Sequence, residues 1–336
     1  MKNALSFAAW GLFALATPFG VASAQDPATI DKVLQQAHDE FQAVTDGKNA
    51  DYIPALAKVP SKLFGIALVT TDGALHAVGD ADALFSIQSI SKVFTMARVI
   101  QDSGEQKIED TVGVDATGQA FNSIIAIEQY KGHQMNALVN PGAIATTGMI
   151  GGKTDAEKWA KILETDSDFA GRKLQVNQEV YESEAATNQR NQAIGELMAA
   201  YGLIQDDPHM VTDIYTKQCS LNVSAKDLAQ MAATLANGGK NPVTKKQVID
   251  PRHVPAILAV MATAGLYDDS GIWLYHVGLP AKSGVGGGII AVAPGRFGIA
   301  AFSPPLDAAG NSVRAQQSIR WIVEQLHANP YASTPR

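Results

Sequence analysis

The sequence predicts an α/β protein of the α+β kind, in which a central antiparallel sheet is flanked by helices and carries a mostly helical inserted section. Strand-like runs occur in two separate stretches, at about residues 60–88 and 278–303. Between about 104 and 265, apolar residues recur instead at the spacing of helix faces. No internal repeat or linker divides the chain, so we expect one domain from residue 25 to residue 336.

The first 24 residues have the layout of a secretory signal. Lys2 precedes an apolar run at residues 8–16, and a small-residue cleavage site ends at Ala24. We therefore expect cleavage after Ala24 and an exported protein, periplasmic or secreted. A transmembrane anchor is the alternative, but the apolar run is short and is interrupted by Pro18 and Gly20.

Composition excludes several classes of partner. The chain carries a net charge of −7 and no strongly basic cluster, so we expect no nucleic-acid partner. No second apolar run reaches membrane-spanning length, so we expect no membrane contact after the signal is removed. Cys219 is the single cysteine, which rules out an intramolecular disulfide and predicts a buried, inert thiol. The seven histidines show no His-x-x-x-His pair, so we expect no metal and no cofactor.

The first elements after the signal are a helix and a hairpin. Apolar residues from Ile30 to Val44 keep the spacing of one helix face, and Gly47 closes that helix. Residues 63–70 then have the composition of a buried strand. Asp72-Gly73 is a turn typical of a hairpin, which pairs this strand with residues 74–78. The sheet therefore leads directly into the next helix.

Helices dominate the middle of the chain. Thr154 is a helix cap, and Ser224 with Asp227 forms a capping box that opens a second helix. The strand pattern resumes after Gly278. The other predicted elements are a helix at 251–264, strands at 281–284, 288–294 and 297–302, and a closing helix at 313–326.

Ser89 and Lys92 form the one Ser-x-x-Lys of the chain. The apolar spacing after Ser89 predicts a helix from about Ser89 to Gly104. Residues three apart share a helix face, so the Lys92 amine can reach the Ser89 hydroxyl. A neutral amine can take the hydroxyl proton and make the serine a nucleophile. The alternative is a serine that caps an ordinary helix beside a solvated lysine.

A second signature lies far downstream, at Lys282-Ser283-Gly284. A Ser-x-x-Lys at the start of a helix, followed by Lys-Ser/Thr-Gly on a strand, resembles the penicillin-recognising serine enzymes and their relatives. The resemblance implies that this strand borders the nucleophile and that the backbone N–H groups of Ser89 and Val285 form an oxyanion hole. Gly284 and the run 286–288 permit the close backbone approach.

Longer stretches resemble the serine-dependent glutaminases, a branch of the same fold that hydrolyses the side-chain amide of L-glutamine. The resemblance implies a β-lactamase/transpeptidase-like fold, L-glutamine as the small-molecule substrate, and a homodimer or homotetramer. It covers about residues 60–325. The matching stretches are Phe85–Lys92, Val139–Ile144, Ser183-Glu184, Arg190-Asn191, Tyr215, Gln218–Ser220, Met231–Gly239, Gly265–Asp268, His276–Val285, Ser303–Asp307 and Gly310–Val313.

The resemblance also implies which residues do the chemistry. Ser89 would attack the amide carbonyl and form a glutamyl-enzyme, and water would then release glutamate. Lys92 would be the base. Tyr215 and Tyr267 would relay protons to the leaving ammonia. Lys282, with its two neighbours in the strand signature, would support this site.

The same resemblance implies how the substrate is held. Glu184 would pair with its α-ammonium group, while Asn140 and Asn191 would hold its α-carboxylate. Gln88 would line the pocket, and Val285 would supply an oxyanion-hole N–H. Chemically, such a head group needs an anion for its ammonium and neutral donors for its carboxylate.

Two residues depart from the glutaminase pattern. Pro141 follows Asn140 where alanine is usual, which affects the loop that would bind the carboxylate. Gln189 stands before Arg190 where aspartate is common. Both positions bear on substrate affinity more than on the chemistry.

Two alternative functions remain open. One is a periplasmic β-lactamase or peptidoglycan peptidase, because Ser220-Leu-Asn222 fits its Ser-x-Asn pattern and Glu184 with Asn188 resembles the acid and amide of one lactamase class. The other is a non-catalytic protein that binds an amino acid, although it would not need both Ser89 and Lys92. A nucleotide loop is excluded because the lysine precedes the glycines of residues 286–288.

Overall fold

The computed structural model describes residues 26–129 and 135–332. The predicted signal peptide and its cleavage site lie outside these residues. Within them, no helix is both long enough and apolar enough to cross a membrane.

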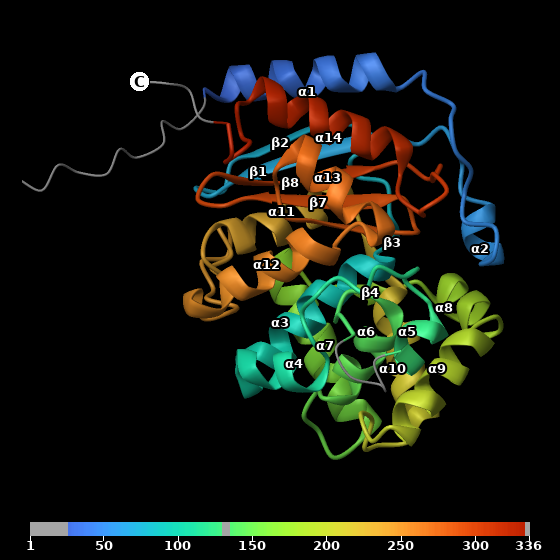
Figure 1. The fold of residues 1–336 in the computed structure, drawn as a ribbon. Helices are drawn as coiled ribbons and strands as arrows, with labels where there is room; N and C mark the ends of the chain where they lie inside the picture. The colour runs from blue at the N-terminus through green and yellow to red at the C-terminus, as the bar shows by residue number, and fades with distance from the viewer. Residues whose placement is uncertain (1–25, 130–134, 333–336) are drawn as a thin grey trace, which may run out of the picture.

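The main sheet is antiparallel throughout and is built from both ends of the chain. Its order is β2-β1-β8-β7-β6, so the N-terminal hairpin pairs through β1 with the C-terminal strands (Figure 1). The predicted antiparallel sheet is therefore confirmed. Its strands are β1 (Gly65–Thr70), β2 (Leu75–Gly79), β6 (Ala281–Gly284), β7 (Gly288–Ala293) and β8 (Phe297–Phe302).

The two faces of the sheet bury alternate residues against different helices. Ile66 and Leu68 of β1 pack toward α1 (Pro27–Phe41) and α14 (Val313–Gln325). Ala67 and Val69 belong instead to the core on the other face. Helix α11 (Ala225–Ala236) lies directly on that face, so the sheet is enclosed on both sides (Figure 1).

Helix α11 approaches the sheet closely because β8 has a glycine at the contact. A Cβ atom on Gly298 would lie 2.1 Å from the Ala233 nitrogen, so no side chain fits between the two elements. The predicted capping box opens this helix, with the Ser224 hydroxyl accepting from the Asp227 N–H. Its buried face then continues into the helical layer.

The helical layer occupies the middle of the chain and lies below the sheet in Figure 1. The predicted helix cap at Thr154 is confirmed, because its side chain accepts from the Glu157 N–H at the start of α7. The remaining helices are α2 (Pro54–Ala57), α3 (Ser91–Ser103), α4 (Glu105–Thr111), α5 (Ile124–Gln129), α6 (Asn140–Gly148), α7 (Asp155–Ala170), α8 (Gln178–Ala185), α9 (Gln189–Ala200), α10 (Pro208–Cys219), α12 (Val254–Ala264) and α13 (Ser270–Val277).

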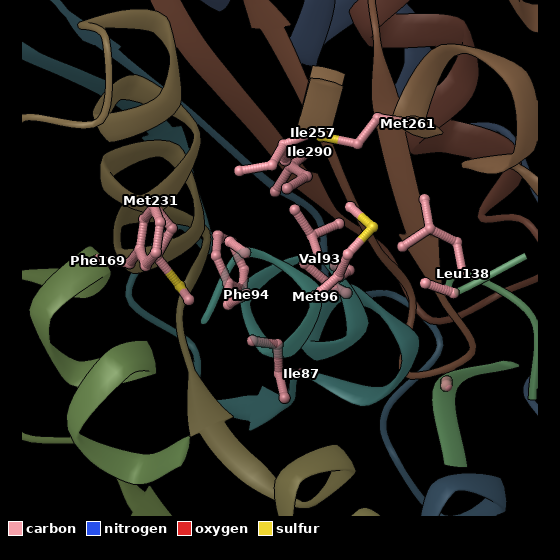
Figure 2. Close-up of a cluster of buried hydrophobic side chains, with 14 of the residues drawn as sticks. Ile87, Val93, Phe94, Met96, Leu138, Phe169, Met231, Ile257, Met261 and Ile290 are labelled. Carbon is pink, nitrogen blue, oxygen red and sulfur yellow. The ribbon is translucent and has the colours of Figure 1, made fainter. Parts of the chain in front are cut away.

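Helix α3 runs through the centre of this layer. Nine of its thirteen residues are buried, so packing around it fixes the residues at its N-terminus. Figure 2 shows side chains of α3 among those of α7, α11, α12 and β7. The labelled residues include Val93, Phe94, Met96, Phe169, Met231, Ile257, Met261 and Ile290.

Two features differ from the sequence expectations. The first helix ends at Phe41 instead of continuing to Val44. A second, small sheet of order β3-β5-β4 was not predicted. Its strands are β3 (Phe85–Ser86), β4 (Gln175–Val176) and β5 (Leu221–Val223), each too short to give an alternating pattern.

Candidate active site

Ser89 lies in a tight turn between β3 and α3. The turn is a 3₁₀ helix, η1 (Gln88–Ile90), so Ser89 precedes the α-helix instead of opening it as expected. Gln88 has a φ of +50°, a conformation that side chains rarely adopt and that occurs often at functional sites. The Lys92 Nζ lies 2.9 Å from the Ser89 Oγ, as the spacing predicts.

The Lys92 amine is almost fully buried. Burial lowers its pKa from the ordinary lysine value to about 8, although the nearby Glu184 carboxylate and Cys219 thiol act in the opposite direction. The amine also donates to the Asn140 Oδ1 at 2.7 Å. Lys92 can therefore lose its proton near neutral pH while it remains in contact with Ser89.

Asn140 connects three predicted site residues. Its Oδ1 accepts from the Tyr215 hydroxyl at 3.1 Å as well as from Lys92, and its Nδ2 donates to the Asn191 Oδ1 at 3.0 Å. Burial raises the pKa of Tyr215 well above its ordinary value, so its phenol keeps its proton. Pro141 fits in the first turn of α6, where a helix needs no N–H donor.

Glu184 provides the buried negative charge of the site. It projects from α8 with 7% of its surface exposed, and its Oε2 accepts from the Gln88 Nε2 at 3.2 Å. Burial raises its pKa to about 7, against the opposing effects of Gln88 and Lys92. In the part of the chain that the structure describes, it forms no salt bridge, so its charge is available to a cationic ligand group.

Strand β6, which carries the Lys282-Ser283-Gly284 signature, lies against the turn η1 that contains Ser89. A Cβ atom on Gly284 would lie 2.7 Å from the Ile87 carbonyl oxygen and 3.3 Å from the Ser89 nitrogen. Only glycine permits this approach, which brings β6 and the following Val285 beside Ser89. Val285 and Ser89 therefore line the same cavity.

Tyr267 contacts Ser89, and Lys282 packs against the Tyr267 ring. The Tyr267 hydroxyl donates to the Ser283 carbonyl at 3.4 Å and also interacts with the Ser89 side chain. Burial raises its pKa to about 12. Lys282 is fully buried, and its Nζ donates to the carbonyl oxygens of Gly265 and Ser283, both at 2.8 Å. It does not line the cavity, so its support of the site is indirect.

These residues surround a cavity of about 110 Å³. Seven of the eight residues predicted to bind substrate line it, namely Gln88, Ser89, Asn140, Glu184, Asn191, Tyr215 and Val285, whereas Tyr267 does not. Lys92 and Tyr267 do not line the cavity, but both contact the Ser89 side chain. Asn188, named only for the lactamase alternative, also lines the cavity. The other lining residues were not predicted as site residues, and they are Tyr52, Phe121, Asn122, Thr187 and Arg190.

Tyr52 is one of the missed residues. It lies directly before the Ile53-Pro54 start of α2, and 55% of its surface is exposed. Exposure depends on the fold, so the sequence did not mark this residue as part of the site. Arg190 was noted only as part of a motif, and its Nε donates to the Asn122 carbonyl at the cavity wall.

Of the features that suggested other chemistry, Glu184 and Asn188 line this cavity, whereas the Ser-x-Asn stretch and Cys219 do not. The Ser220 hydroxyl donates to the Thr216 carbonyl inside α10, and neither it nor Asn222 lines the cavity. Cys219 is buried with a pKa raised to about 12, chiefly by burial. Among residues 26–129 and 135–332, no group of three or more His, Cys, Asp or Glu could hold a metal ion.

The fold and the site define a class. An antiparallel sheet with a helical layer, a buried Ser-x-x-Lys pair and a Lys-Ser-Gly strand beside it are features of the β-lactamase-like serine enzymes. The comparisons with known proteins narrow this class. A sequence model of the family described as Glutaminase matches residues 47–331.

Relatives of known sequence support the same assignment. A glutaminase of Colwellia psychrerythraea is 53% identical over 307 residues, which is 91% of this chain and 98% of that protein. Glutaminase 2 of Yersinia pestis is 47% identical over 310 residues, covering 92% of this chain and 91% of its own length. The chain therefore belongs to the glutaminase family of enzymes.

Solved structures confirm the fold. A structure described as probable glutaminase ybaS superposes with a TM-score of 0.91 at 46% identity, covering 92% of this chain and all of that one. Mglu in its Tris and glutamate form superposes with a TM-score of 0.87 at 38% identity, covering 93% of this chain and 69% of that one. The predicted resemblance to the glutaminases and their fold is confirmed.

Proposed function

We propose that the protein hydrolyses the side-chain amide of L-glutamine to L-glutamate and ammonia through a Ser89 acyl-enzyme, with Lys92 as the base. The observation that carries this proposal is the 2.9 Å contact between the Lys92 Nζ and the Ser89 Oγ, together with the pKa of Lys92 lowered to about 8. An amine of that pKa is substantially neutral at mildly alkaline pH and can accept the serine proton.

The polar groups of the cavity support an α-amino acid as substrate. The Glu184 carboxylate suits an α-ammonium group, and the amides of Asn140 and Asn191 can donate to an α-carboxylate. A related protein, Mglu, is described in a glutamate form. With the head group held by these residues, the side-chain amide extends toward Ser89.

The reaction follows from these positions. Lys92 takes the proton of Ser89 while the Oγ attacks the amide carbon, and the N–H groups of Ser89 and Val285 stabilise the oxyanion. The C–N bond then breaks, and the proton passes from Lys92 to the leaving ammonia through Tyr215 or Tyr267. Water, activated by Lys92, attacks the ester and releases glutamate and Ser89.

The nucleophile is tested by Ser89→Ala. We expect ammonia release from L-glutamine to fall by roughly a thousandfold or more, because no ester can form. Wild-type protein should release far less ammonia from D-glutamine, since its head group would be misplaced. Ser318→Ala is the control, because Ser318 is a buried serine on α14 that does not line the cavity. A Ser89→Ala variant with full activity would refute the acyl-enzyme.

The lactamase alternative is tested with the same preparation. The chromogenic lactam nitrocefin and L-glutamine are offered side by side to the wild-type protein. We expect ammonia from glutamine and little lactam turnover, because Ser220 and Asn222 do not reach the cavity. Rapid lactam turnover without ammonia release would favour the alternative.

We also propose that the protein is exported and self-associates as a homodimer or homotetramer. The layout of residues 1–24 supports export, and the resemblance to glutaminases supports self-association. Mass spectrometry of the protein from its native host is expected to find an N-terminus at Gln25. Light scattering is expected to give the mass of two or four chains. An intact N-terminus and a monomer mass would contradict the respective proposals.

A further inference from the structure

We propose that Lys282 is a positioning residue, whose buried amine holds the Tyr267 phenol in the place that proton transfer at Ser89 requires. This inference rests on the proposed function and adds a role that acts through Tyr267. The cavity does not include Lys282, so the residue cannot act by binding substrate. Its amine contacts the Tyr267 ring, the Gly265 carbonyl, and the Ser283 carbonyl that also accepts from the Tyr267 hydroxyl.

The amine lies between the turn that carries Tyr267 and the strand β6. Its Nζ donates to the Gly265 carbonyl, two residues before Tyr267, and to the Ser283 carbonyl on β6. It also lies 4.2 Å from the centroid of the Tyr267 ring. The Tyr267 hydroxyl donates to the same Ser283 carbonyl. One amine therefore contacts the backbone before the tyrosine, its ring, and the acceptor of its hydroxyl.

The turn itself is unfavourable for a tyrosine. Tyr267 has a φ of +53°, and such a conformation persists only where the surroundings hold it. Gly265 lies so close to β6 that a Cβ atom there would meet the Ala281 carbonyl oxygen at 1.7 Å. The Lys282 amine contacts both the Gly265 carbonyl and the Tyr267 ring. In the proposed role, these contacts help to hold the strained conformation.

Stability alone does not explain this lysine. Its amine is fully buried, and it has no carboxylate partner in the described part of the chain. Burial, with the neighbouring Lys92, lowers its pKa well below the ordinary value. Both carbonyls would keep a hydrogen-bond donor without Lys282. The Gly265 carbonyl also accepts from the Ser283 N–H, and the Ser283 carbonyl also accepts from the Tyr267 hydroxyl. Burying this amine therefore costs stability, as is common for groups kept for function.

The charges around the pair decide what pH measurements should show. The groups that act on Lys282 or Tyr267 are Lys92, Cys219, Ser89, Ser283, Tyr52 and Tyr215. Of these, Lys92 titrates near neutral pH. The groups that shift the pKa of Lys92 are Cys219 and Glu184, besides burial, and Lys282 is not one of them, so replacing Lys282 should leave the titration of Lys92 in place.

The first experiment compares Lys282→Met with Lys158→Met. For Lys282→Met we expect kcat to fall by roughly ten- to a hundredfold, because a misplaced phenol slows proton transfer. We expect KM to change by less than about threefold, the acid limb of the pH profile to stay in place, and the melting temperature to stay equal or rise. Lys158 is also buried and donates to two backbone carbonyls, but it pairs with Asp206. Lys158→Met should lower the melting temperature and leave kcat unchanged.

The second experiment is a double-mutant cycle with Tyr267→Phe. If Lys282 acts through the Tyr267 phenol, replacing Lys282 in the Tyr267→Phe enzyme has no further effect. The kcat of the double variant should therefore match that of Tyr267→Phe within about threefold. The proposal would be overturned if the effects of the two substitutions on kcat multiply in the double variant. It would also be overturned by a Lys282→Met enzyme with unchanged kcat. Lys282→Leu replaces the methionine variant if that one does not fold. Failure of both to fold would also overturn it, since the amine would then be structural.

The two proposals fail separately. If Ser89→Ala keeps its ammonia release, the proposed function is wrong whatever the lysine does. If Ser89→Ala is inactive and the cycle is multiplicative, the proposed function stands and the positioning role does not.

Discussion

At the scale of single residues, Glu184 gives the clearest dependence on pH. Its pKa is raised to about 7 because it is buried, so the carboxylate is lost as the pH falls through 7. Lys92, with its pKa lowered to about 8, gains its proton over an overlapping range. The proposed mechanism requires an ionised Glu184 and a neutral Lys92, so both titrations act on the acid side.

We therefore expect log kcat/KM to rise with pH, with a slope that approaches two below pH 7 and falls to zero above pH 8. Glu184→Gln should weaken substrate binding by roughly ten- to a hundredfold and reduce the slope to one. Glu182→Gln, an exposed neighbour on α8, should keep both the slope and the activity. A slope of two in Glu184→Gln would show that Glu184 does not bind the ammonium group.

The sequence predicted which residues gather here, but not how they are connected. Asn140 was expected to hold a carboxylate, and its Oδ1 accepts from Lys92 and Tyr215. An amide can donate or accept in several directions, so a sequence motif cannot fix its partners. For the same reason, the position of Lys282 behind Tyr267 could not be derived from a Lys-Ser-Gly on a strand.

At the scale of elements, α7 contains a buried carboxyl group without a partner in the part of the chain that the structure describes. Asp166 is fully buried, and neither of its carboxyl oxygens has a hydrogen-bond partner within the described residues. Burial raises its pKa well above the ordinary value, so the folded protein holds a proton that the unfolded chain releases above its usual pKa. Asp166 therefore lowers the free energy of unfolding, and it does so more strongly as the pH rises above about 4.

Asp166→Asn should accordingly stabilise the protein more at pH 7 than at pH 4. The gain at pH 7 comes from removing the cost of protonating the carboxyl on folding, which is about 1.4 kcal/mol for each tenfold increase in its proton affinity. Urea unfolding at the two pH values measures it. Asp168→Asn is the control, because Asp168 is on the same helix and pairs with Lys246 nearer the surface. An equal gain at both pH values would mean that Asp166 is not protonated in the folded state.

Long elements were predictable and short ones were not. The capping box at Ser224 and the hairpin at Asp72-Gly73 carry local signals, and the helix and hairpin form where expected. Strands of two or three residues and the 3₁₀ turn at Ser89 have too few residues for a periodic signal. Packing against neighbouring elements determines them instead.

At the scale of the whole molecule, the site lies where the sheet meets the helical layer. Ser89 and Glu184 come from the helical side, whereas Gly284 and Val285 come from the sheet. The antiparallel sheet could be predicted from strand signals at both ends of the chain. The resemblance implied that the strand at Lys282–Gly284 borders Ser89, but no local pattern predicts the close approach of Gly284 to the Ser89 nitrogen that makes this junction.

The order of the sheet has a consequence for aggregation. Strand β6 forms one edge, and the turn η1 packs against it, so that edge is closed to another chain. Strand β2 forms the opposite edge. Chains that join by adding a strand would therefore stack beyond β2, and their catalytic clefts would stay open to solvent.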